Sequence, residues 1–163
     1  MWTFAPALAF NDSRVIPLPR PIAQLRVTDA FEATPLTVPF RDGSVRRGRS
    51  RGGVDIAIRG QLAQHGDTLR LSEPEMHATI ESVRAALRVS DPEETYGLAL
   101  YRFVPPGLTL DQAHTLRGFV GCTTVKFEYD LSDRALYGYS LIVHASDPTL
   151  QDGPLLSDSV ALA

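Results

Sequence analysis

The sequence predicts a mainly β, α+β protein: an antiparallel β-sandwich or split barrel with one flanking α-helix. Two observations support this fold class. Segments that alternate apolar and polar residues occur on both sides of residues 73–89, and only that segment has clear helical periodicity. Because parallel strands need a long crossover connection, usually a helix, a single helix favours antiparallel pairing.

The helix is predicted at residues 73–89. Ser72 and Glu75 have the spacing of a capping box, in which each residue satisfies a free backbone amide at the start of the helix. Apolar residues then follow at intervals of four, three and four, which places them on one face: Met76, Ile80, Val83 and Leu87. Pro92 ends the pattern, because the residue before a proline disfavours helix.

Alternation of side chains predicts the strands. Residues 54–62 and 137–145 give the clearest patterns, and further strands are expected at residues 2–10, 22–27, 36–38, 96–103 and 122–130. In residues 122–130 the inward set is taken to be Val125, Phe127 and Tyr129. The short linker 131–136 predicts that the last two strands form an antiparallel hairpin. A helical turn is expected near residues 111–116.

The 163 residues fit a single domain, 1–163. Its proline-rich start, 1–40, is expected to be an extended arm with edge strands, since proline cannot donate to a strand ladder. Residues 41–53 are rich in arginine and glycine and are predicted to be a loop that is mobile or ordered by a partner. Residues 54–150 should form the β-sandwich with its helix, and 151–163 a C-terminal tail.

Composition excludes several classes of protein. A single cysteine, Cys122, allows no disulfide within the chain and no thiolate metal cluster. No stretch of about 18 apolar residues is present, so no membrane span is expected. The apolar start lacks the basic residues of a signal peptide. The net charge of -3 gives no overall attraction to nucleic acid.

The sequence predicts no catalytic, cofactor or metal site. Its four histidines lack metal-ligand spacing, and no nucleophile elbow is present. The glycines of residues 41–53 precede a strand, whereas phosphate-binding loops open a helix. One weak enzymatic alternative stays open, in which Cys122 and His144 converge with an acid. The carboxylates of Asp130 and Asp133 lie beside a turn and are expected to cap backbone amides there.

The candidate functional residues are the arginines of residues 41–53. We expect them to contact an adjacent subunit or to line a channel, because the guanidinium fork pairs well with carboxylates at interfaces. They are Arg41, Arg46, Arg47, Arg49 and Arg51. A solvated loop and contact with nucleic-acid phosphates are the alternatives. Base stacking is not expected, since no aromatic residues are interleaved with the arginines.

The order of the elements over residues 50–150 has a known parallel. A strand at Val54–Leu62 leads into a capped helix ending near Leu87, then a strand at Leu98–Phe103, and a last strand closing on His144–Pro148. This order resembles the distal tail proteins of long-tailed, siphovirus-type bacteriophages and related tail-tube-like ring proteins. The chain departs from larger members by having no room for a C-terminal carbohydrate-binding-like domain.

The resemblance implies a structural subunit without cofactors. It would form a hexameric ring that joins the tail tube to the baseplate or tail tip around the DNA channel. Its partners would be further copies of itself, the tail tube protein and the hub proteins of the tail tip or baseplate, with DNA passing non-specifically through the lumen and no membrane involved. Its location would be the virion, after assembly in the host cytoplasm.

Other functions compete with this one. A tail tube or tail terminator subunit belongs to the same class of protein. A carbohydrate- or ligand-binding β-domain would need exposed aromatic side chains, and its candidates are Trp2, Tyr96, Tyr101 and Tyr139, the last of which alternation places in the core. A small enzyme is the remaining alternative.

Overall fold

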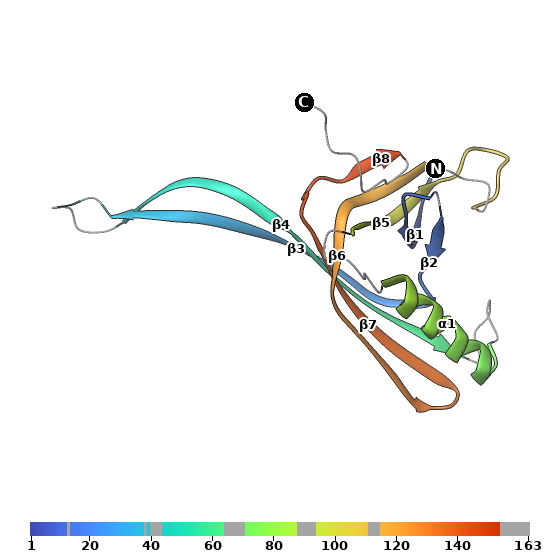
Figure 1. The fold of residues 1–163 in the computed structure, drawn as a ribbon. Helices are drawn as coiled ribbons and strands as arrows, with labels where there is room; N and C mark the ends of the chain where they lie inside the picture. Colours follow the sequence, from blue (N-terminus) through green and yellow to red (C-terminus); the bar gives the residue numbers. More distant parts are fainter. Residues whose placement is uncertain are drawn as a thin grey trace.

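The computed structural model describes residues 1–12, 14–37, 39, 44–63, 71–87, 94–110 and 115–153, with the side chains of all but 30–37, 44–51 and 63. Figure 1 shows the elements in order along the chain. They are β1 Trp2–Ala9, β2 Val15–Pro17, β3 Ile22–Thr37, β4 Ser44–Ala63, α1 Glu73–Leu87, β5 Tyr96–Phe103, β6 Thr115–Asp133, β7 Leu136–Ala145 and β8 Gln151–Gly153.

All described strand pairs are antiparallel and belong to one sheet. The order of the strands across it is β2-β1-β5-β6-β7-β4-β3, and β8 pairs with β6. The prediction of a mainly β fold with antiparallel pairing and one flanking helix is therefore confirmed.

Strand β6 joins two halves of the sheet. Its first part pairs with β5 and β8, and its second part, from Cys122 onward, pairs with β7. The change of partner falls beside Gly121, whose φ of 63° is in the left-handed region. Figure 1 shows the sheet turning at this level, with β1, β2, β5 and β8 above and β7 below.

The main core lies between the bent sheet and α1. The inward residues of β4 and β7 alternate as predicted, and the four apolar residues of α1 join them in one buried cluster. The Glu75 half of the predicted capping box also forms: Oε2 of Glu75 accepts a hydrogen bond from the backbone N–H of Ser72 at 2.7 Å, and it accepts another from the Ser72 hydroxyl at 2.8 Å. The periodic patterns of the sequence therefore mark the buried faces correctly.

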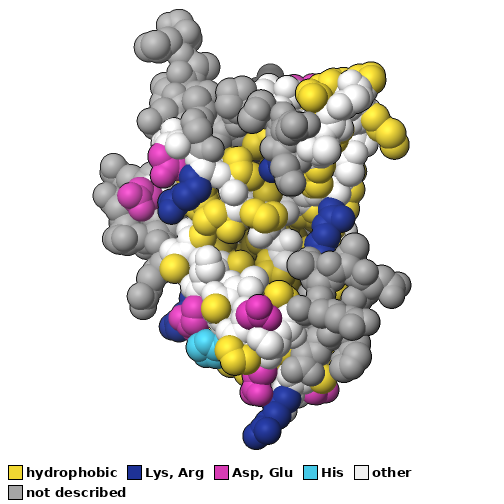
Figure 2. All heavy atoms as spheres, turned by 90° about the vertical axis from the view of Figure 1, so that its right-hand side faces the viewer, with side chains coloured by type: hydrophobic (Ala, Val, Ile, Leu, Met, Phe, Trp, Pro, Cys, Tyr) yellow, Lys and Arg dark blue, Asp and Glu magenta, His cyan; other side chains and the backbone are white. Residues whose placement is uncertain are grey.

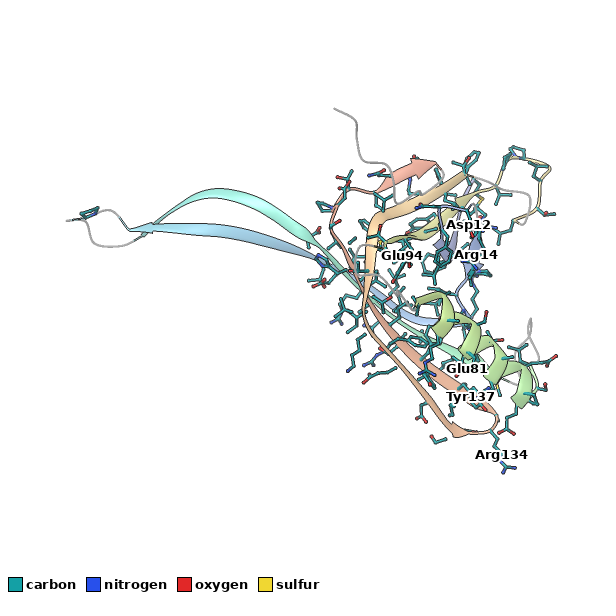
Figure 3. The ribbon with its side chains drawn as sticks, in the orientation of Figure 1. Asp12, Arg14, Glu81, Glu94, Arg134 and Tyr137 are labelled. Atoms are coloured by element: carbon teal, nitrogen blue, oxygen red, sulfur yellow. The ribbon has the colours of Figure 1, made fainter. Side chains whose placement is uncertain are left out.

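The β6–β7 hairpin is confirmed, with a turn at Arg134 and Ala135. Figure 3 shows Arg134 at its tip, away from the body. The acids near this turn cap backbone amides as expected: Asp130 accepts from Ser132 N–H at 2.9 Å, and Asp133 accepts from Ala135 N–H at 2.8 Å. Both carboxylates therefore accept hydrogen bonds within the β6–β7 hairpin itself.

The prediction that Val125 points inward is wrong, since its side chain is 62% exposed. Thr124 pairs with Val143 and Lys126 with Ile142, so Val125 is the extra residue of a β-bulge. A bulge inserts one residue and thereby reverses the alternation on one side of it. Phe127 and Tyr129 beyond the bulge are partly buried, as expected.

The N-terminal part of the chain differs from the predicted arm. Strand β1 lies inside the sheet, between β2 and β5, and buries Ala7, Leu8 and Ala9. Pro6 fits there because it lies in an irregularity of register between Phe4 and Ala7. Strands β2 and β3 do form the two edges of the strand order, as the prolines suggested.

Three segment boundaries also need correction. Residues 22–27 and 36–38 were predicted as separate strands, but β3 runs without interruption through Thr37, and its edge position tolerates Pro35. Residues 115 and 116 begin β6 and do not form a helical turn, while 111–114 lie outside the described residues. The start of the predicted tail, 151–153, is β8, held by pairing with β6.

Candidate functional site

The largest difference from the sequence prediction lies at the candidate site itself. Residues 44–53, expected to be a loop, are the first half of β4. They pair with β3 as far as Thr37 and Ser44. Backbone hydrogen bonds between the two strands therefore form this part of β4, although its sequence has no alternation of apolar residues. Composition alone does not reveal this, because an arginine- and glycine-rich segment has little local preference for a strand.

This half of β4 leaves the body of the protein. Strand β4 pairs with β7 only from Val54 to Ala63, whereas its pairing with β3 continues to Ser44. Figure 1 shows the two strands extending far beyond the sheet. We call residues 29–37 and 44–53 the projecting hairpin. In the described part of the chain, no third strand pairs with it.

Four of the five predicted arginines are brought together on one strand of the projecting hairpin. The arginines are Arg46, Arg47, Arg49 and Arg51, whose side chains are outside the described part of the structure. The β3 residues opposite them are, in the same order, Pro35, Thr34, Ala33 and Phe31. Arg41 lies outside the described residues altogether. The arginines therefore follow a ladder that is paired on one side only.

The base of the projecting hairpin lies beside the end of β7. Val54 pairs with Ala145 on one side of β7, and Cys122 pairs with the same residue on the other side. The two strands that flank β7 both bend here at glycines with positive φ: β4 at Gly53, with a φ of 107°, and β6 at Gly121, with a φ of 63°. The end of β7 is thus the point from which β4 continues into the hairpin and β6 into the upper half of the sheet.

Two polar side chains meet at this base on the outer face of the sheet. Asp55 and His144 are register partners in β4 and β7, and the imidazole Nδ1 lies 2.7 Å from the carboxylate Oδ1. Both are partly exposed. From the sequence, His144 was considered in the enzymatic alternative with Cys122 and was not paired with Asp55. The pairing was missed because it depends on strand register, which the sequence does not fix.

The enzymatic alternative fails on geometry. Cys122 is opposite Ala145 and points into the core, whereas His144 is one residue away and points outward. Burial raises the pKa of the Cys122 thiol to about 12, which opposes formation of the nucleophilic thiolate.

Among the described residues, no group of three or more histidines, cysteines or acids could hold a metal ion. No described helix is long and apolar enough to cross a membrane.

The four aromatic residues considered for ligand binding divide into two pairs. Tyr96 and Tyr139 are buried; their hydroxyls contact Thr124 Oγ1 at 2.6 Å and the carbonyl of Pro19 at 2.6 Å. Burial raises the pKa of both phenols. Neither can serve as an open stacking platform.

Trp2 and Tyr101 lie nearer the surface, on β1 and β5. Each has a cross-strand ring partner in edge-to-face contact: Phe103 for Trp2 and Phe4 for Tyr101. The Arg117 guanidinium covers the Trp2 ring at 4.2 Å and binds Asp152 through two hydrogen bonds of 2.5 and 2.7 Å. These hydrogen bonds lower the pKa of Asp152. The Trp2 ring is therefore covered by the protein itself.

Hydrophobic side chains are nevertheless visible on this side of the molecule. Figure 2, seen from the side of β1, β2 and α1, shows them in the middle of the body and at its upper right edge, with charged side chains around them. The exposed ones near β1 and β5 are Met1, Phe4, Tyr101, Leu108 and Leu110.

Comparisons with known proteins find similarity in structure only. No protein-family model matches the chain, and no curated protein sequence is significantly similar to it. Among solved structures, it is similar to the Dit protein of SPP1, described as a paradigm of the hub adsorption apparatus in phages that infect Gram-positive bacteria. The TM-score is 0.55 at 14% identity, over 93% of this chain and 53% of the SPP1 chain.

A second similar structure is a chain in the tail of the empty GTA particle, solved with C6 symmetry. The TM-score is 0.50 at 13% identity, and the match covers 91% of this chain and 93% of the other. The chain thus spans about half the length of the SPP1 protein and nearly the full length of the GTA protein. At these identities the similarity establishes the fold: this chain has the β-rich fold shared by these two tail proteins.

Proposed function

We propose that the chain is a structural subunit of a phage-type tail, a distal tail protein that assembles into a hexameric ring through its projecting hairpin. The observation that carries the proposal is the hairpin itself. An isolated two-stranded ribbon is only marginally stable in water. A ribbon that leaves its own sheet at Val54 and pairs with no third described strand is therefore suited to gain its stability from a neighbouring subunit.

The similar structures support this class of function. Both belong to tail assemblies, and the GTA tail was solved with sixfold symmetry. A ring of identical subunits needs a heterologous contact, in which one surface of a subunit meets a different surface of the next. A projecting hairpin on one side of a compact body supplies such an asymmetric contact (Figure 1).

A tail tube subunit is the second candidate, and the similarity to a chain of the GTA tail supports it. The match covers 93% of the GTA tail chain but only 53% of the SPP1 Dit chain. The two candidates differ in how rings associate. A distal ring forms once, whereas tube subunits stack into many rings. Electron microscopy of the purified protein, together with native mass measurement, separates a single sixfold ring from stacked rings.

The role of the arginines is tested by reversing their charge. Replacing Arg46, Arg47, Arg49 and Arg51 by glutamate is expected to leave the monomer folded and to abolish rings, because the glutamates would repel the carboxylates of the neighbour with which the arginines are proposed to pair. Circular dichroism measures folding, and native mass spectrometry measures ring formation.

A matched control makes the same change of net charge on the body. It replaces four exposed arginines outside the projecting hairpin by glutamate: Arg14, Arg59, Arg84 and Arg134. Rings should survive this control. Rings that also survive reversal on the hairpin would contradict the subunit contact and would leave channel lining as the role of these arginines.

A further inference from the structure

We propose that Asp55 and His144 form a clamp that fixes the direction in which the projecting hairpin leaves the body. Three residues at the hairpin base carry this inference: Asp55 and His144, which bind each other, and Gly53, against which the imidazole lies. The geometry of the clamp stands on the described residues alone. Its consequence for assembly rests on the proposed function.

The backbone at the base is irregular at the point where the hairpin leaves the sheet. Asp29 pairs with Val54, but the next register pair is Phe31 with Arg51, so β4 has one residue more than β3 in this interval. A bulge of this kind bends its strand and increases the local twist. Gly53 lies within the interval with a φ of 107°. The direction of the hairpin is therefore set over very few residues.

The His144 side chain fills the space beside this bulge. A Cβ atom placed on Gly53 would lie 2.8 Å from Cε1 of the imidazole and 2.7 Å from the carbonyl oxygen of Ala145. Both distances are too short for any residue but glycine to be accommodated without movement. The imidazole and the end of β7 together thus form a stop on one side of the Gly53 backbone.

Asp55 holds the imidazole in this position. The ring would otherwise rotate about its side-chain bonds, but the 2.7 Å contact between Nδ1 and Oδ1 of Asp55 restricts it. The two side chains are 38% and 55% exposed. A pair this exposed contributes little to global stability. Its effect is therefore expected on the orientation of the hairpin more than on the unfolding of the body.

Small changes at the base are amplified along the hairpin. Residues 44–53 form an extended strand beyond the base, about 30 Å at roughly 3.3 Å per residue, so a rotation of about 10° moves the far end by about 5 Å. A displacement of this size would move the arginines out of reach of a neighbouring contact surface. The clamp would thus prearrange the hairpin for assembly.

The test measures the hairpin direction by pulsed electron paramagnetic resonance. Spin labels are placed at Ser44→Cys, at the far end of residues 44–53, and at Ser82→Cys on the exposed face of α1. Cys122 is fully buried and remains unlabelled. The doubly labelled chain is diluted into unlabelled chain, so that only distances within one molecule are recorded in monomers and in rings alike.

The clamp predicts a single narrow distance distribution in the native chain. His144→Ala and Asp55→Ala should broaden this distribution, and Asp55→Asn should restore the narrow one, because an amide can still bond to the imidazole. Lys126→Ala is the matched control. It breaks the exposed contact of 2.7 Å between Lys126 and Glu128 on β6 and should leave the distribution unchanged.

A distribution that stays narrow in both His144→Ala and Asp55→Ala would overturn the clamp. Ring formation of each variant, measured separately, tests the proposed function. A native chain that never forms rings, combined with broadened distances in the two alanine variants, would refute the function and support the clamp. Rings formed by the native chain, combined with unchanged distances in the two alanine variants, would support the function and refute the clamp.

Discussion

The two halves of β4 are covalently one strand but differ in almost every other respect. Residues 54–63 pair with strands on both sides and bury Val54, Ile56, Ile58 and Leu62. Among the described strands, residues 44–53 pair with β3 alone, and they include four arginines. Residues 54–63 are held by side-chain burial, and residues 44–53 by backbone pairing with β3. The comparison separates the part of the chain that stabilises the fold from the part available to a neighbour.

The boundary between the halves is as informative as the halves themselves. It coincides with the last register pair of β4 and β7, Val54 with Ala145, and with the positive φ of Gly53. Apart from Asp55, whose proposed effect is on the hairpin direction, a change in the body half should therefore reach the hairpin only through unfolding. A change in the hairpin half should leave the body intact. The following predictions test that separation.

The largest effect is expected in the body half of β4. Ile58→Ala removes a side chain with no exposed surface and should lower the free energy of unfolding by about 3 kcal/mol, because it leaves a cavity in the core. Urea denaturation followed by circular dichroism measures the change. Arg49→Ala in the hairpin half is the control and should alter the value by less than about 0.5 kcal/mol.

Equal losses in the Ile58→Ala and Arg49→Ala variants would show that the hairpin half contributes to the stability of the monomer. The distinction between the two halves of β4 would then be lost.

An intermediate effect is expected from alkaline pH, which acts on the buried groups of the body. Burial raises the pKa of Cys122 from 9.0 to about 12 and also raises the pKa values of Tyr96 and Tyr139. Above pH 9 the unfolded chain loses the thiol proton while the folded chain keeps it. Between pH 9 and 10, where the phenols of the unfolded chain are still mostly protonated, the free energy of unfolding should therefore fall by about 1 kcal/mol as the thiol of the unfolded chain ionises.

Denaturation at a series of pH values between 9 and 11 measures this slope. Cys122→Ala should make the slope shallower, since one of the titrating groups is removed, whatever its effect on stability at neutral pH. An identical slope in the variant would show that the thiol is not protected by burial.

The smallest effect is expected at the helix start. Hydrogen bonds from the Ser72 backbone N–H and hydroxyl lower the pKa of Glu75. The stabilisation is therefore present above pH 4.5 and is lost as pH falls through the lowered value. Glu75→Gln should slightly lower the urea midpoint at pH 7, and its difference from the native chain should shrink as pH falls below 4.5. A difference that stays constant as the pH is lowered would show that the charge is not the cause.

Much of the body could be predicted from the sequence. The α1 stripe, the alternation of β4 beyond Val54, that of β7 and the capping residues Ser72 and Glu75 are all local patterns with a fixed period. Each pattern specifies its own buried face, because the period of a helix or strand decides which side chains share that face. Val125 was wrongly predicted to point inward because a bulge interrupts the alternation, and no feature of residues 122–130 indicates the bulge.

The candidate site was predicted only in its residue types. The arginines were identified, but as members of a loop, because four glycines and no apolar alternation give residues 41–53 no local preference for a strand. Their pairing with β3 depends on residues more than ten positions away. The contact between Asp55 and His144 likewise requires the β4–β7 register, which joins residues 89 positions apart.

The sequence by itself determined the class of fold, the position of the helix and the buried faces of α1, of β7 and of β4 beyond Val54, because burial is encoded there by periodic side chains. Only the tertiary structure decided where β4 leaves the sheet, that the arginines lie on a ladder, and that His144 meets Asp55 instead of Cys122. These features depend on which strands become neighbours. That choice is made by the packing of the whole chain and leaves no periodic signal in any one segment.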